Sequence, residues 1–106
     1  LTTLNGQTIW DPSGWNLDRI TKIEVELEWE SAGAGDIDLY NVSDGAKLAD
    51  LVTPSAATSK TIQRIDVTTA VKGLTAAKIL AIQAAGDGTN AVTVYTAKLV
   101  VTLVLG

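Results

Sequence analysis

The residues of this chain that could do chemistry are almost all carboxylates and aromatic rings. The sequence contains no His and no Cys, so a nucleophile lacks its usual base and zinc lacks its usual ligands. No glycine-rich phosphate loop precedes a predicted helix. Asp and Glu could supply the paired acids of a glycosidase, but a domain of 106 residues offers little room for a deep cleft. We therefore expect that the protein is not an enzyme.

Four aspartates at or near predicted turns are the candidates for a cation site. Their hard oxygen ligands suit calcium, although their spacing matches no EF-hand loop. The stretch Gly86-Asp-Gly-Thr-Asn90 is more simply a hairpin turn. We therefore expect no cofactor, with calcium as the one cation that these residue types favour. The four candidates are Asp36, Asp38, Asp44 and Asp87.

Five aromatic residues limit the surfaces that could bind a sugar by stacking. Trp29 falls on the apolar side of its predicted strand and should lie in the core, whereas Tyr40 falls on the polar side of the next one. The candidate glycan platforms are therefore Trp10, Trp15 and Tyr40; the alternative for the two tryptophans is that they close one end of the fold. The triplet that begins at Asn41 matches the N-glycosylation pattern at a predicted turn.

The elements that must position these residues are strands. From Ile23 to Glu30, apolar residues alternate with glutamates, as in a strand with one solvated face. We predict that residues 23–30 and 36–41 form a hairpin around a loop at 31–35. A short strand at 46–52 should follow and end at Pro54, before a loop at 55–59.

The four glutamates of residues 23–30 admit two interpretations. On one face of a strand they could bind cations or a basic partner. They could equally be a charged stripe that prevents strands from pairing edge to edge, and we favour this second interpretation.

The second half of the chain continues the β pattern. Residues 61–68 predict a strand and residues 68–73 a short helical turn. The alanines of residues 76–85 would suit a helix, but the context favours a strand. Residues 90–105 read as one long strand of roughly 50 Å. We expect it to bend near Ala97 and Lys98, and then to be covered on both faces like a central strand. The fold class is all-β, an antiparallel sandwich of jelly-roll type with about seven or eight strands.

Charge and hydropathy exclude two classes of partner. The net charge is −4, and the eight basic residues are scattered, so nucleic acid is not an expected ligand. No apolar run reaches the roughly 18 residues of a membrane span, so we expect no membrane insertion. The chain begins at Leu1 rather than Met, which suggests either a removed secretory signal or a piece of a longer chain.

Three stretches in order resemble a known pattern: Ile20-Thr-Lys-Ile-Glu-Val-Glu-Leu-Glu-Trp29, Ile65-Asp-Val-Thr-Thr-Ala-Val-Lys-Gly-Leu74, and Ala91-Val-Thr-Val-Tyr-Thr-Ala-Lys-Leu-Val-Val-Thr-Leu103. Together they resemble the DNRLRE-type and related carbohydrate-binding-module-like sandwiches of microbial surface proteins. The resemblance covers roughly residues 20–104 and implies a jelly-roll fold. Such domains usually begin with further strands, and this chain has only 19 residues before Ile20. We therefore expect one edge of the sandwich to be under-built.

An under-built edge leaves unpaired backbone groups that a neighbour's strand could cover, as in donor-strand complementation. We therefore expect a structural, self-assembling subunit of an extracellular filament, surface layer or virion. Residues 1–18 would be an N-terminal arm and residues 19–106 the sandwich. The alternative is a carbohydrate-binding module of a larger surface protein, with a glycan as its partner. The donor candidates in the arm are Leu1, Leu4, Ile9 and Trp10.

Overall fold

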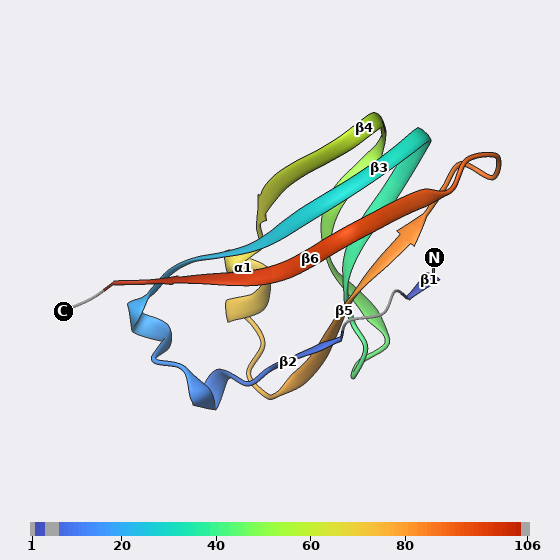
Figure 1. Cartoon of the computed structure of the whole chain (residues 1–106). Helices are drawn as coiled ribbons and strands as arrows, with labels where there is room; N and C mark the ends of the chain where they lie inside the picture. Colours follow the sequence, from blue (N-terminus) through green and yellow to red (C-terminus); the bar gives the residue numbers. More distant parts are fainter. Residues whose placement is uncertain (1, 4–6, 105–106) are drawn as a thin grey trace.

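The computed structural model describes residues 2–3 and 7–104, and over these residues all the strands pair antiparallel in one continuous sheet (Figure 1). Helix is confined, in this part of the chain, to two 3-10 turns and the short helix α1 (Thr68–Lys72). The prediction of an antiparallel all-β fold is confirmed, whereas a jelly roll of seven or eight strands stays a prediction. The six strands are β1 (Thr2–Thr3), β2 (Thr8–Trp10), β3 (Ile20–Asn41), β4 (Ala46–Asp66), β5 (Lys78–Ala85) and β6 (Val92–Leu103).

The frame of the fold is a long bent hairpin of β3 and β4, which have 22 and 21 residues. The tight turn between them contains Gly45 at a φ of 66°, a conformation that suits glycine. On its other edge, β3 pairs first with β6, up to Ser31, and then with β5, from Asp36 onward. β6 and β5 thus share one edge of β3, and the core lies between the two halves of the bent sheet (Figure 1).

The bend of β3 lies at residues 31–35, and the prediction of a hairpin loop at this place was wrong. The strand continues through these small residues, with register shifts against β4 on both sides of Gly35. A Cβ atom at Gly35 would lie 2.8 Å from Cγ2 of Val92, so glycine allows a close approach between strands. Small residues favour a sharp bend as much as a turn, which explains the error.

The prediction that Pro54 ends a strand was also wrong, because β4 runs through it to Asp66. Within the described residues β4 pairs with β3 alone and is therefore an edge strand. A proline lacks only the N–H that a central strand would need, so an edge strand tolerates it.

Strict alternation correctly predicted the core side of β3. Ile23, Val25, Leu27 and Trp29 are all at most 3% exposed, while the glutamates between them lie on the opposite face. The predictions of a strand in residues 76–85 and of a helical turn before Gly73 are confirmed by β5 and α1.

β6 differs from the predicted central strand. Within the described residues it pairs with β3 alone, and its irregularity lies beside Tyr95 rather than at Ala97. Its inward residues are poorly covered, since Leu99 is only half-buried and Leu103 is 44% exposed. The apolar residues on both faces reflect the β propensity of Val and Thr, not burial on two sides.

Candidate functional site

A groove runs between β6 and the strands β2 and β5, and it reaches the core. Its volume is about 280 Å³. The floor contains Val25, Leu39 and Leu80, which are at most 3% exposed, and Leu99 of β6 forms part of one wall. Lys98 is the one charged residue among the described residues that line the groove. An apolar groove of this kind can receive an extended, uncharged segment.

Two strand edges border this groove. The 12-residue strand β6 pairs with β3 on one side, and β2 pairs with β5 on one side. In the part of the chain that the structure describes, the other edge of each strand has no partner. The backbone groups of such edges pair readily with an added strand. These two edges lie on either side of the groove, and the under-built edge of a sandwich stays a prediction.

The described strands of the N-terminal segment, Thr2–Thr3 and Thr8–Trp10, pair with β5 of their own chain. Thr8, Ile9 and Trp10 pair in register with Leu80, Ile79 and Lys78. Of the predicted donor residues, Ile9 is 71% exposed, whereas Trp10 is 1% exposed and belongs to the chain's own core. Leu1 and Leu4 lie outside the described residues.

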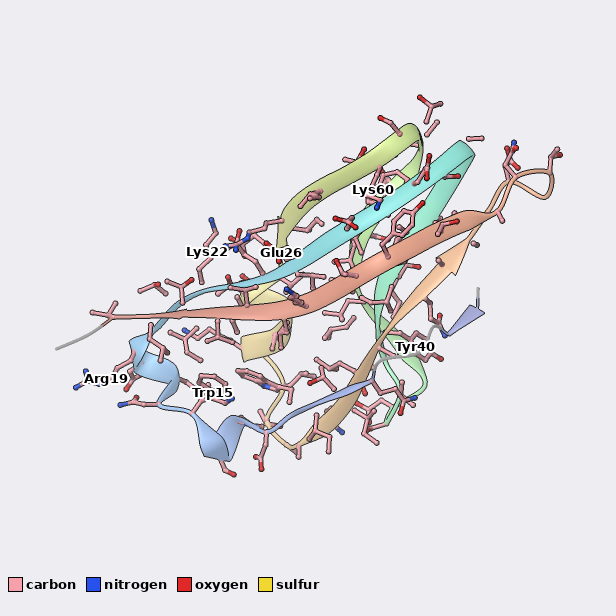
Figure 2. The ribbon with its side chains drawn as sticks, in the orientation of Figure 1. Trp15, Arg19, Lys22, Glu26, Tyr40 and Lys60 are labelled. Atoms are coloured by element: carbon pink, nitrogen blue, oxygen red, sulfur yellow. The ribbon has the colours of Figure 1, made fainter. Side chains whose placement is uncertain are left out.

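The three predicted glycan platforms are not brought together. Trp10 is buried against Trp15, with ring centroids 5.6 Å apart, so it cannot offer a free face to a sugar. Trp15 is 39% exposed, and Tyr40 is half-buried. Figure 2 shows Trp15, in the segment between β2 and β3, well apart from Tyr40 of β3. A flat multi-ring platform is therefore not formed by these residues.

The glutamates of β3 face basic residues from both neighbouring strands. Arg64 of β4 lies 3.2 Å from Glu26 and 3.8 Å from Glu24, and Lys98 of β6 lies 3.9 Å from Glu26. Figure 2 shows Lys22 and Glu26 of β3 and Lys60 of β4 one after another along this part of the sheet. Because the chain's own cations occupy the glutamates, the geometry favours the charged stripe over a site for a basic partner. The stripe also includes the pairs Lys22–Glu24 and Lys60–Glu28 and the hydrogen bond from Tyr95 to Glu30.

Two of the four predicted cation ligands come together, and a third carboxylate joins them. Asp36 and Asp38 of β3 meet Asp50 of β4, with one oxygen of each within 4.8 Å of the others. Burial, followed by the nearby charge of Asp36, raises the pKa of Asp38 to about 6. Lys47 donates a hydrogen bond of 2.9 Å to Asp50. Sequence reasoning missed Asp50, since bulges in the β3–β4 register decide that it stands opposite Asp38.

Asp44 and Asp87, the other two predicted ligands, are used in turns. Asp44 accepts a hydrogen bond of 2.8 Å from Lys78, which lowers the pKa of its carboxyl group. Asp87 accepts backbone hydrogen bonds from Thr89 and Asn90, and these lower its pKa, the one from Asn90 most. Asp87 therefore stabilises a local turn, and Asp44 ties the β3–β4 turn to Lys78 of β5.

Asn41, the predicted glycosylation acceptor, is 4% exposed. Its Nδ2 donates a hydrogen bond of 3.0 Å to Asp44, and its Oδ1 accepts one from the Asp44 backbone. The folded domain therefore keeps this amide nitrogen inside the β3–β4 turn.

Comparisons of this chain with family models, with curated proteins and with solved structures returned no match. Among residues 2–3 and 7–104, no helix has the length and apolar character needed to cross a membrane.

Proposed function

We propose that this domain is a structural subunit that assembles with copies of itself by exchanging its N-terminal segment. The assembly would be an extracellular filament, a surface layer or a virion. The observation that carries the proposal is the apolar groove between β6 and β2, bordered by two strand edges that lack a second partner among the described residues. In the exchanged state the segment of another copy would take the place of β2 beside β5 and form one wall of this groove.

The exchanged segment is residues 1–10, which would take the place of β2 along β5 of another copy. Within the described residues, its ladder with β5 has only five register pairs, in two short pieces. The same hydrogen bonds can form with β5 of a neighbour, so exchange costs little contact energy, as in domain swapping. Gln7 and Thr8 also form part of one wall of the groove, so release of the segment opens the groove to an incoming strand.

Charge does not oppose this exchange. The segment contains no Asp, Glu, Lys or Arg, although the chain as a whole has a net charge of −4. The glutamate stripe lies on the other face of β3, away from the core side that the groove reaches. Repulsion between two acidic copies therefore falls outside the contact, where Lys98 is the one charged residue among the described residues of the lining.

Trp10 would act as the anchor of the exchanged segment. It is 1% exposed in the chain's own core, and burial of so large a ring stabilises whichever copy receives it. Repeated head to tail, one segment per copy produces an open chain of subunits rather than a closed dimer.

Light scattering coupled to size-exclusion chromatography, with negative-stain electron microscopy of the same fractions, tests this function. We expect multimers whose share grows with protein concentration. The variant Leu99→Lys should reduce them, because it places a charge on the groove wall. Val100→Lys, the next residue of β6, lies on the other face and is the matched control. A protein that remains monomeric at high concentration would overturn the proposal.

Binding of a glycan is the second candidate, and the exposed face of Trp15 is the observation that favours it. A glycan array comparing the wild-type protein with Trp15→Ala tests it. Specific binding that the substitution abolishes would support this function, and no binding at all would exclude it.

A further inference from the structure

Three carboxylates meet on the outer face of the sheet, next to the β3–β4 turn. Asp36 and Asp38 are two residues apart on β3, so both point away from the core side that Ile37 occupies. Asp50 stands opposite Asp38 in the register of β4. One oxygen of each lies within 4.8 Å of the other two. Two paired strands therefore hold three carboxyl groups together.

Asp38 provides a separate observation that points to a ligand. The residue is only 2% exposed, and its Oδ1 atom has no hydrogen-bond partner among the described residues. A buried carboxylate oxygen without a donor is costly, and native structures rarely leave one unmatched. Lys47 donates to Asp50, and a side-chain hydrogen bond with Asp50 helps to raise the pKa of Asp38, but neither contact gives the Oδ1 atom of Asp38 a partner. A cation at this place would compensate the charge and the missing contact.

We propose that Asp36, Asp38 and Asp50 bind one calcium ion. Calcium takes oxygen ligands at 2.3–2.6 Å, so two ligand oxygens on one ion can be up to about 5 Å apart. The three carboxylate oxygens lie within this limit. Magnesium requires shorter bonds in a near-ideal octahedron, which oxygens held by two paired strands match less well. Water would complete the coordination, since Asp50 is exposed on its outer side.

Lys47 is the competitor of the ion. Its ammonium group lies 2.9 Å from Oδ1 of Asp50, and its side chain is 51% exposed, so it can turn into solvent when calcium binds. Removing this positive charge should therefore strengthen calcium binding. Once bound, the ion ties β3 to β4 and stabilises the fold by linkage. The site does not depend on strand exchange, so either proposal can fail without the other.

Calorimetric titration of the chelator-treated full chain with calcium chloride at neutral pH tests the site, and thermal unfolding supplies a second readout. We expect one ion per chain, with a dissociation constant of about 1 mM or tighter, as in extracellular calcium modules. Asp38→Asn and Asp50→Asn should each weaken binding by about tenfold or more. Lys47→Met should bind more tightly, and Asp18→Asn, an exposed aspartate elsewhere, is the charge-matched control.

Circular dichroism shows whether each variant is folded. If Asp38→Asn does not fold, the calcium affinity of Asp50→Asn is the test of the site. The proposal is overturned if calcium produces neither heat nor a rise in Tm. It is also overturned if the folded Asp variants keep the wild-type affinity. Equal affinity for magnesium would overturn the assignment to calcium.

Discussion

A disulfide between positions 9 and 79 should hold the N-terminal segment on its own sheet and prevent assembly. Ile9 of β2 and Ile79 of β5 are register partners, and their side chains are 71% and 37% exposed, so both lie on the outer face. Antiparallel partners have Cα atoms about 4.5–5.5 Å apart, which is within the range that a disulfide spans. The chain has no other cysteine to compete for the new thiols.

The size of the effect follows from the loop that the disulfide closes. Positions 9 and 79 are separated by 70 residues of chain. A loop of that length loses unfolded-state entropy worth about 4 kcal/mol, if the bond fits without strain. The oxidised variant should therefore be more stable as a monomer than the reduced one. The exchanged state, in which Ile9 leaves its own β5, becomes inaccessible to it.

The Ile9→Cys/Ile79→Cys protein is oxidised as a dilute monomer, so that the disulfide forms within one chain. After concentration it is compared with the reduced protein by light scattering and by unfolding in denaturant. We expect multimers to disappear on oxidation and to return on reduction. Ile9→Ser/Ile79→Ser controls for the loss of two apolar side chains. If the oxidised protein assembles as well as the reduced protein, strand exchange is refuted.

Three further predictions concern the fold. Trp10→Ala should cost about 3–5 kcal/mol of unfolding free energy, because the ring is 1% exposed; a loss below about 1 kcal/mol in denaturant would contradict its place in the core. A hydrogen bond from the hydroxyl of Thr68 lowers the pKa of Asp66 below its ordinary value of 3.8. The ionised carboxylate therefore stabilises the fold at any pH above 3.8. This stabilisation is lost as the pH falls through the lower pKa of the folded state. Asp66→Asn should therefore make Tm fall less steeply as the pH is lowered. A fall of Tm equal to that of the wild-type protein would refute the stabilising role of Asp66. Gly86→Ala should lower Tm, because a Cβ atom there would overlap the backbone of Asn90. Gly14→Ala is the control, since no described atom lies within 4 Å of its new methyl group. Equal Tm values for the two variants would contradict the packing at Gly86.

Local patterns predicted the strands that have one solvated face. The alternation around Trp29 identified both faces of β3, and the apolar run of residues 79–82 correctly favoured a strand over a helix. The sequence did not distinguish a turn from a bend at Gly35, because small residues allow both. It also did not show that Pro54 lies on an edge strand, since edge position depends on which strands pair.

The candidate sites were predictable only where their residues are neighbours in sequence. Asp36 and Asp38 are two residues apart on one strand, and both were predicted as cation ligands. Asp50 was not, because register shifts near Ile37 and Leu39 decide which residue of β4 faces Asp38. The pairing of β2 with β5 spans most of the chain and leaves no local signal in either strand.

Cross-linking between two different single-cysteine variants tests strand exchange most directly. Ile9→Cys and Ile79→Cys proteins are mixed, incubated at high concentration and oxidised. The proposed exchange predicts a disulfide-linked heterodimer, because residue 9 of one copy pairs with residue 79 of another. Ile9→Cys mixed with Ile62→Cys is the control, since Ile62 is 65% exposed but lies on β4, away from the segment. A heterodimer yield no higher than that of the control would contradict exchange of the N-terminal segment.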